Sequence, residues 1–253
     1  MRFSANLGFL WSDLSLPDAI RAAKAAGFDA VECHWPYTVP PALINAALAE
    51  TGLKLLGLNT SRGDVEAGEN GLSALPGREA DARAAIDQAV AYAIEVRAAN
   101  IHVMAGFAAG AEAHQTFVEN LRHACAAAAP HGITILIEPL NSYDAPGYFL
   151  QTTSQAVQIL GEVDAPNLKL MFDCYHVQLM EGDLSHRLAR LKPQIGHIQF
   201  ASVPDRGAPD QGEVNYAHVF AVIDQMGYDQ PLGAEYKPKG PTDDTLDWMQ
   251  RLR

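Results

Sequence analysis

The amino-acid sequence predicts an α/β fold in which eight strand–helix units close into a single (β/α)8 barrel, a TIM barrel, over residues 1–253. Short apolar runs alternate with amphipathic segments along the whole chain, which is the pattern of repeated βα units. The runs are continuously apolar, as in parallel strands that helices cover. The chain has 253 residues, close to the ~250 residues typical of this barrel. An open doubly wound sheet is the alternative, but the turn 7–11 (LGFLW) after the first strand lacks the GxGxxG pattern of a Rossmann fold.

Eight segments have the length and composition of buried strands. They are FSANL (3–7), DAVEC (29–33), LKLLGL (53–58), NIHVMA (100–105), ITILIE (133–138), LKLMFD (168–173), IGHIQF (195–200) and PLGAEY (231–236).

Helix candidates lie between and after these strands. The first, 15–27, offers Ser15 as a cap, Pro17 in its first turn and Gly27 as a stop. The other seven are 41–52, 79–99, 117–132, 152–163, 183–191, 216–227 and 242–252. The longest loops, 59–76 and 201–215, follow strands and therefore lie on the face where barrel enzymes carry their chemistry.

Charge and composition narrow the class of protein. Eighteen Lys and Arg against thirty Asp and Glu give a net charge of −12, and no basic run stands out, so we expect no nucleic-acid partner. No apolar run reaches the ~20 residues of a membrane span. The N-terminus lacks a signal peptide, and three cysteines without CxxC spacing suit a reducing compartment, so a cytoplasmic location is expected. The sequence leaves open whether the chain forms a homo-oligomer.

The last four predicted strands each end at or next to an oxygen-bearing side chain: Glu138, Asp173, Gln199 and Glu235. A single strand-end carboxylate could simply cap the next helix. Neighbouring parallel strands, however, would bring all four together, and three negative charges in a low-dielectric pocket repel strongly. A divalent cation would compensate them, and oxygen ligands favour Mg²⁺ or Mn²⁺ over zinc.

Four further residues are candidates for substrate binding. His176 follows Asp173 by three residues, beyond the strand end, where its imidazole could face the substrate or support a residue that does. Arg206, in the loop after the seventh strand, could hold a substrate carboxylate in a bidentate fork, and Lys237 could serve the same anionic end. His102 lies within the fourth strand, where it would line the barrel. The alternatives are a surface-loop histidine, solvated cations and a core histidine.

Glu138 and Glu235 together suit proton transfer beside a carbonyl group. One glutamate would remove a proton from carbon and the other would return a proton to the neighbouring carbon, while a hard metal ion stabilises the enediolate oxygens. The sequence contains no nucleotide-binding loop, nucleophile elbow or reactive Cys–His signature. An isomerase or epimerase of a small hydroxy-carbonyl compound is therefore the reaction class expected.

Several stretches of the chain closely resemble hydroxypyruvate isomerases. These enzymes belong to the xylose isomerase-like barrels, which also include ketose epimerases, xylose isomerase and endonucleases of the endonuclease IV type. The matching stretches are RFSANLGFLW, AGFDAVECHWPY, GDVEAGENGLSALPGRE, IEPLNSYDAPGYFL, DCYHVQLMEGDL, GHIQFASVPDRGAPDQGEVNY and GAEYKPKG.

The resemblance implies interconversion of hydroxypyruvate and 2-hydroxy-3-oxopropanoate (tartronate semialdehyde), with Glu138 and Glu235 as the acid/base pair. It implies a divalent metal held by these two glutamates, Asp173 and Gln199, although it leaves open whether the metal is required. Ketose epimerases usually carry His where Gln199 stands, so this chain departs from their ligand set.

Other readings of the resemblance remain open. A 2-oxo-tetronate isomerase or a ketose 3-epimerase would use the same site. A sugar-acid binding protein or an abasic-site endonuclease would represent a different class. The endonuclease pattern needs several histidine ligands, and neither Gln199 nor the loop 212–214 supplies one.

Overall fold

The computed structural model describes residues 1–252 and contains eight strands whose pairings are all parallel. They are β1 (Phe3–Asn6), β2 (Ala30–Glu32), β3 (Gly57–Asn59), β4 (Asn100–His102), β5 (Thr134–Ile137), β6 (Leu168–Asp173), β7 (Ile195–Phe200) and β8 (Leu232–Ala234).

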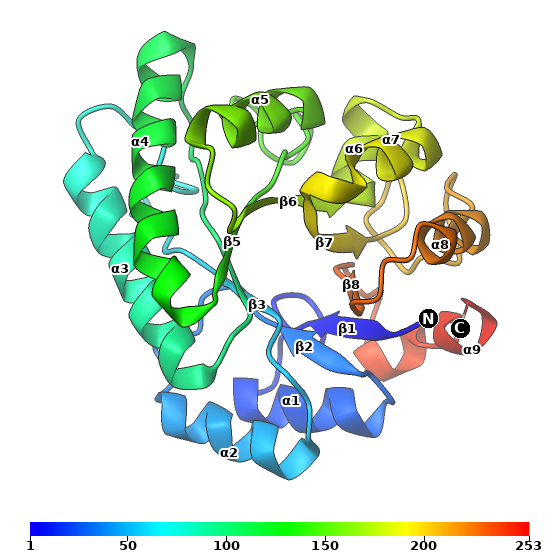
Figure 1. Cartoon of the computed structure of the whole chain (residues 1–253). Helices are drawn as coiled ribbons and strands as arrows, with labels where there is room; N and C mark the ends of the chain where they lie inside the picture. The colour runs from blue at the N-terminus through cyan, green and yellow to red at the C-terminus, as the bar shows by residue number, and fades with distance from the viewer. Residues whose placement is uncertain (253) are drawn as a thin grey trace.

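The strands form a ring in chain order. The hydrogen-bonded order is β2-β1-β8-β7-β6-β5-β4-β3. A parallel bridge between Val31 and Leu55 joins the two ends, and the backbone N–H of Cys33 donates to the carbonyl of Gly57 at 3.0 Å. Figure 1 shows the ring surrounded by helices. The predicted (β/α)8 barrel is therefore confirmed, and the open sheet is excluded.

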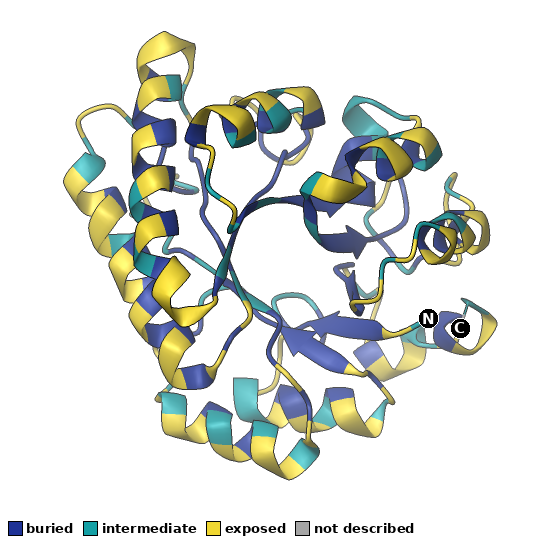
Figure 2. Cartoon of the chain, viewed as in Figure 1, coloured by how far each residue is buried: buried dark blue, intermediate teal, exposed yellow. Residues whose placement is uncertain are grey.

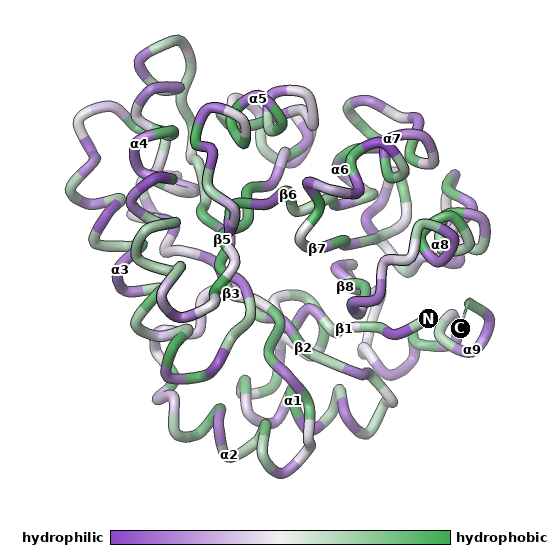
Figure 3. The backbone as a smooth tube through the Cα atoms, in the orientation of Figure 1, coloured by the Kyte–Doolittle hydropathy of each residue, from purple (hydrophilic) through white to green (hydrophobic). Residues whose placement is uncertain are grey.

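Helices cover the outside of the ring. They are α1 (Leu16–Ala25), α2 (Pro41–Thr51), α3 (Glu79–Val96), α4 (Gly110–Ala128), α5 (Thr153–Val163), α6 (Cys174–Met180), α7 (Leu184–Leu191), α8 (Tyr216–Gln225) and α9 (Trp248–Leu252), with short 3₁₀ turns at Ala129–His131, Lys192–Gln194 and Thr242–Thr245. Each long helix is buried on one side and exposed on the other (Figure 2), and hydrophobic and hydrophilic positions alternate along α3 and α4 (Figure 3). This two-faced pattern is what the 3.6-residue period predicts.

The structure corrects the sequence prediction at several boundaries. Helix α6 was not predicted, and it begins directly at the end of β6, so His176 lies on a buried helix and not in a loop. Helix α4 begins at Gly110, earlier than the predicted 117, and β3 is shifted to 57–59. The predicted final helix 242–252 is split into the 3₁₀ turn and α9.

Candidate active site

A cavity of about 280 Å³ lies at the carboxyl ends of the strands. It brings together six of the eight predicted site residues: His102, Glu138, His176, Arg206, Glu235 and Lys237. Asp173 ends β6 and lies within 3.7 Å of Arg206, so it belongs to the same cluster. Glu138 and Glu235 line one cavity although 97 residues separate them in the sequence, as convergence of parallel strands requires.

The guanidinium of Arg206 occupies the centre of this cluster. Its Nη2 lies 2.6 Å from Glu235 Oε2 and 3.7 Å from Asp173 Oδ2. Its Nη1 lies 3.3 Å from Asp144 Oδ2. The rings of Phe9 and Tyr175 each lie 5.0 Å from the guanidinium carbon. The carboxylates are thus partly neutralised by a fixed cation of the protein itself.

The loop after β7 holds Arg206 in place. Its backbone has a φ of 53°, in the left-handed region that costs a non-glycine residue energy. Its N–H donates to the Ser202 carbonyl at 2.9 Å, and its own carbonyl accepts from the Lys237 N–H at 2.7 Å. Contacts to two loops therefore impose the conformation that carries the guanidinium into the cavity.

The two glutamates have opposite ionisation behaviour although both are buried, at 5% and 6% exposure. Burial raises the pKa of Glu138 well above its usual 4.5, and the nearby charges of Glu235 and Asp173 raise it further. Burial also disfavours the charge of Glu235, but Arg206 and the hydrogen bond from His34 outweigh it and lower its pKa to about 2. The surroundings therefore favour the protonated form of Glu138 and the ionised form of Glu235, a division of the kind that marks acid/base pairs.

His176 is held in a single tautomer. Its Nδ1 accepts a hydrogen bond from the backbone N–H of Asn141 at 3.0 Å, so Nδ1 carries no proton. Burial lowers the pKa of His176 to about 3. The neutral ring must then carry its proton on Nε2, which lies 3.5 Å from Asp173 Oδ2 and 3.9 Å from Glu138 Oε1.

Glu138, Asp173 and His176 could hold a metal ion, since one ligand atom from each lies within 4.8 Å of the others. Glu138 Oε1 and Asp173 Oδ2 are buried and have no hydrogen-bond partner in the described chain. Two carboxylate oxygens without donors fit a hard divalent cation. The protonated Nε2 of His176 offers no lone pair, so the oxygens are the better donors. Burial raises the pKa of Asp173 to about 7, although Arg206 opposes the shift.

His102 borders Glu138 as a neutral imidazole. Its Nδ1 lies 3.5 Å from Glu138 Oε2. Burial lowers the pKa of His102 to about 4. Neither ring nitrogen has a hydrogen-bond partner among residues 1–252, so both remain available to a bound molecule.

Gln199 is engaged in a separate buried cluster. Its Nε2 donates to Glu32 Oε2 at 3.3 Å, and His197 Nε2 lies 2.8 Å from the same oxygen. Gln199 Oε1 has no hydrogen-bond partner within the described residues. Its role as a metal ligand stays a prediction, and so does substrate binding by Arg206, whose guanidinium is already paired with carboxylates.

Gly233 makes room for this cluster, because Glu32 must cross the barrel from β2 to reach β7. A Cβ atom at Gly233 would lie 2.2 Å from Glu32 Oε1 and 2.8 Å from Gln199 Cγ. We expect Gly233→Ala to destabilise the fold by about 1–3 kcal/mol through overpacking, measured by urea unfolding. The matched control is Gly161→Ala in α5, where a Cβ meets nothing within 4 Å; it should leave stability unchanged or raise it by up to ~1 kcal/mol. Equal stability of the two variants would contradict the prediction.

Sequence reasoning missed several residues that shape the site. Asn6 donates to Glu235 Oε1 at 2.8 Å, and His34 Nε2 lies 3.0 Å from the same oxygen. Both sit at or just after strand ends, which is the signal that could have found them. Asp144 Oδ2 pairs with Arg206 Nη1 at 3.3 Å.

Comparison with known proteins places the chain in a family. It is 46% identical to a 2-oxo-tetronate isomerase of Cupriavidus necator, over 98% of this chain and 97% of that protein. It is 37% identical to a hydroxypyruvate isomerase of Escherichia coli, over the full length of both. A solved structure described as an AP endonuclease of family 2 from Brucella melitensis superposes with a TM-score of 0.96 at 38% identity, covering 100% and 99% of the two chains. The family model of the xylose isomerase-like TIM barrels matches residues 20–252. The chain belongs to the xylose isomerase-like TIM barrel family.

Proposed function

We propose that this protein is an isomerase that interconverts hydroxypyruvate and 2-hydroxy-3-oxopropanoate. The observation that carries the proposal is the pair of buried glutamates, Glu138 and Glu235, which line one cavity and whose pKa values are shifted in opposite directions. Such a pair supplies both a proton acceptor and a proton donor. The similarity to a hydroxypyruvate isomerase and a 2-oxo-tetronate isomerase supports the same reaction class.

Glu235 is the base of the forward reaction in this proposal, because it is the ionised glutamate. It removes a proton from C3 of hydroxypyruvate, which leaves an enediolate across C2 and C3. Glu138 then gives its proton to C2, while the hydroxyl proton at O3 is lost and O2 is protonated, so that C3 becomes the aldehyde. Arg206 holds Glu235 in position, and the Nε2–H of His176 points toward Glu138 and Asp173.

Asp173, together with Glu138 when its carboxyl group is ionised, would hold a divalent cation, which we propose to be Mg²⁺ or Mn²⁺. Such an ion supplies stabilisation of the enediolate oxygens. We expect the isolated protein to bind Mn²⁺ in a calorimetric or electron-spin titration, and Asp173→Asn to weaken this binding at least ~10-fold. The control is Asp87→Asn, a surface residue that pairs with His123. Equal Mn²⁺ affinity of wild type and Asp173→Asn would remove these ligands from the proposal.

A proton NMR time course in D₂O tests the function. The C3 proton signal of hydroxypyruvate should decrease through exchange with solvent. The product should carry deuterium at C2, so that its C2 proton signal is missing. Repeating the run with a chelator, and then with added Mg²⁺ or Mn²⁺, measures the requirement for metal. Absence of enzyme-dependent exchange in every condition would exclude the isomerase.

The 46% identity to a 2-oxo-tetronate isomerase favours a second candidate substrate. A 2-oxo-tetronate has one more carbon than hydroxypyruvate. One extra hydroxymethyl group changes the binding free energy in a pocket only modestly. The ratio of kcat/KM for the two acids decides between them. A ketose 3-epimerase would instead exchange the C3 proton of neutral ketoses.

The name of the Brucella structure raises the endonuclease alternative for this chain. The net charge of −12 opposes binding to DNA. Incubation with a duplex that contains an abasic site tests it directly. Strand cleavage that depends on Glu138, or salt-sensitive binding, would favour the nuclease over the isomerase. A sugar-acid binding protein would bind hydroxypyruvate without any exchange of deuterium.

A further inference from the structure

The carboxyl groups of the active-site cavity lie deep inside it, whereas a lysine lies at its edge. Glu138, Asp173 and Glu235 are buried, and the guanidinium of Arg206, whose side chain is 11% exposed, lies between Asp173 and Glu235. Lys237 lines the same cavity but is exposed at its edge. A small acid that enters must therefore pass a cation before it reaches a floor lined with carboxyl groups.

The cationic and basic groups deep in the cavity each lie beside a carboxyl group of the protein. Arg206 contacts Glu235 at 2.6 Å and Asp144 at 3.3 Å. His102 Nδ1 lies 3.5 Å from Glu138 Oε2, and His176 Nε2 lies 3.5 Å from Asp173 Oδ2. A substrate carboxylate bound at any of these three groups would therefore lie close to a carboxyl group that is already in place.

Lys237 is different in this respect. Among the described residues its ammonium takes part in no ion pair, whereas Lys239, two positions later, lies 3.4 Å from Asp205. Its backbone is fixed, because its N–H donates to the Arg206 carbonyl at 2.7 Å. Lys237 is also only two residues beyond Glu235, so its side chain starts beside the proposed base.

We propose that Lys237 is the anchor for the substrate carboxylate and makes the site selective for hydroxy-oxo acids over neutral hydroxy ketones. The proposal rests on the isomerase function proposed above. In hydroxypyruvate the carboxylate is bonded to C2, one of the two reacting carbons. When Lys237 holds this carboxylate at the rim of the cavity, the C2 and C3 oxygens point inward, toward Glu138 and Glu235. Without Lys237, the same carboxylate would face an acidic floor with only long-range attraction to Arg206.

The test compares two substrates of the same carbon skeleton. Dihydroxyacetone is hydroxypyruvate with a hydroxymethyl group in place of the carboxylate, so it reports on the chemistry without the anion. We expect Lys237→Met to raise KM for hydroxypyruvate ~10- to 100-fold, the scale of a lost charge-assisted hydrogen bond. The effect of Lys237→Met on deuterium exchange into dihydroxyacetone, which has no carboxylate, should be much smaller than its effect on hydroxypyruvate. Lys237→Arg should restore most of the affinity for hydroxypyruvate, because it keeps the charge.

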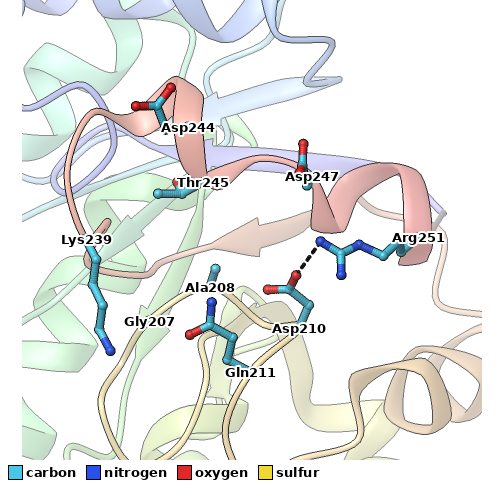
Figure 4. A pocket seen from close by; sticks show the side chains of 9 residues that line it. All are labelled: Gly207, Ala208, Asp210, Gln211, Lys239, Asp244, Thr245, Asp247 and Arg251. Carbon is cyan, nitrogen blue, oxygen red and sulfur yellow. Dashed lines mark ion pairs between the residues drawn. The ribbon is translucent and has the colours of Figure 1, made fainter.

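Lys239→Met is the matched control. Lys239 lines a second cavity, of about 290 Å³, that is lined by none of the candidate catalytic residues. Figure 4 shows Lys239 there with Gly207, Ala208 and Asp210. Lys239→Met, like Lys237→Met, removes one exposed lysine. It should behave as wild type toward both hydroxypyruvate and dihydroxyacetone. A loss of hydroxypyruvate affinity as large as that of Lys237→Met would mean that general charge, and not an anchor, attracts the substrate.

A binding measurement separates failure of the anchor from failure of the isomerase. Calorimetric titration with glycerate and glycerol compares an acid with a neutral polyol, and neither has a carbonyl group that could react. Wild type should prefer glycerate, and Lys237→Met should lose that preference. Suppose that wild type exchanges neither substrate but Lys237→Met still loses the preference for glycerate. The role of Lys237 in binding the carboxylate is then supported, and the isomerase function is refuted. If Lys237→Met keeps the preference, or loses activity equally toward both substrates, the anchor is wrong.

Discussion

Glu138→Gln and Glu235→Gln are each expected to lower kcat for hydroxypyruvate by about 10³- to 10⁴-fold, the upper range for loss of a general acid or base. Glutamine keeps the shape of each side chain but cannot transfer the proton. Deuterium exchange should separate the two roles. Glu235→Gln should abolish loss of the C3 proton, whereas Glu138→Gln should leave slow exchange at C3 and stop delivery of a proton to C2.

The two variants should also differ in stability. Measuring the unfolding of each variant shows whether a loss of activity comes from the missing carboxyl group or from loss of the fold. Glu138 has a folded pKa above its usual 4.5, so the folded state binds the extra proton and loses stability as the pH rises above 4.5. Glu138→Gln removes this loss and should be at least as stable as wild type at pH 7. Glu235 has a folded pKa of about 2, so its contribution is full above 4.5 and disappears as the pH falls toward 2. Glu235→Gln lacks this contribution and should unfold at a lower temperature at pH 7. Near-normal turnover in either folded variant would refute the two-glutamate mechanism.

Arg206→Met is expected to destabilise the protein by about 3–5 kcal/mol, as happens when one partner of a buried ion pair is removed. The reason is the cluster of Glu235, Asp144 and Asp173 around its guanidinium. Arg206 lowers the pKa of Glu235 and of Asp173, so both carboxyl groups should become easier to protonate in the variant. Part of the lost stability should then return as the pH is lowered from 7 toward 5. We also expect kcat/KM to fall about 10²- to 10³-fold, the scale of a lost electrostatic contact at a reacting centre.

Arg187→Met is the control for the Arg206 variant. Arg187 Nη1 lies 2.8 Å from Glu181 Oε1, and this largely buried ion pair joins α7 to the end of α6, away from the cavity. It should lower stability without the large loss of kcat/KM. Unfolding by urea at several pH values and steady-state kinetics measure both effects. An Arg206→Met protein of normal activity would show that the guanidinium is not needed to organise the glutamates.

The sequence predicted most of the barrel because repeated apolar runs and amphipathic segments constrain it strongly. It also predicted that Glu138, Asp173 and Glu235 converge, because parallel strands place their carboxyl ends on one face. Helix α6 was missed because Asp173 both ends β6 and caps the helix: its Oδ1 accepts from the Tyr175 N–H at 2.9 Å. No turn residue separates the two elements, so the pattern does not mark where one stops.

The electrostatic arrangement of the site could not be predicted. The pairing of Arg206 with Glu235 depends on the loop conformation around a left-handed backbone, which apolar periodicity does not encode. The contact of Gln199 with Glu32 joins strands on different parts of the ring and depends on Gly233. A strand-end position therefore predicts that a side chain lies near the site, but it does not predict the residue with which that side chain forms a hydrogen bond or an ion pair.

The hydrogen bond from the Lys237 N–H to the Arg206 carbonyl has a practical consequence for engineering. It ties the segment after β7 to the segment after β8, so neither can be redesigned alone without disturbing the other's geometry. Anyone who wishes to transplant the proposed acid preference of this barrel onto a sugar epimerase should therefore graft both segments together.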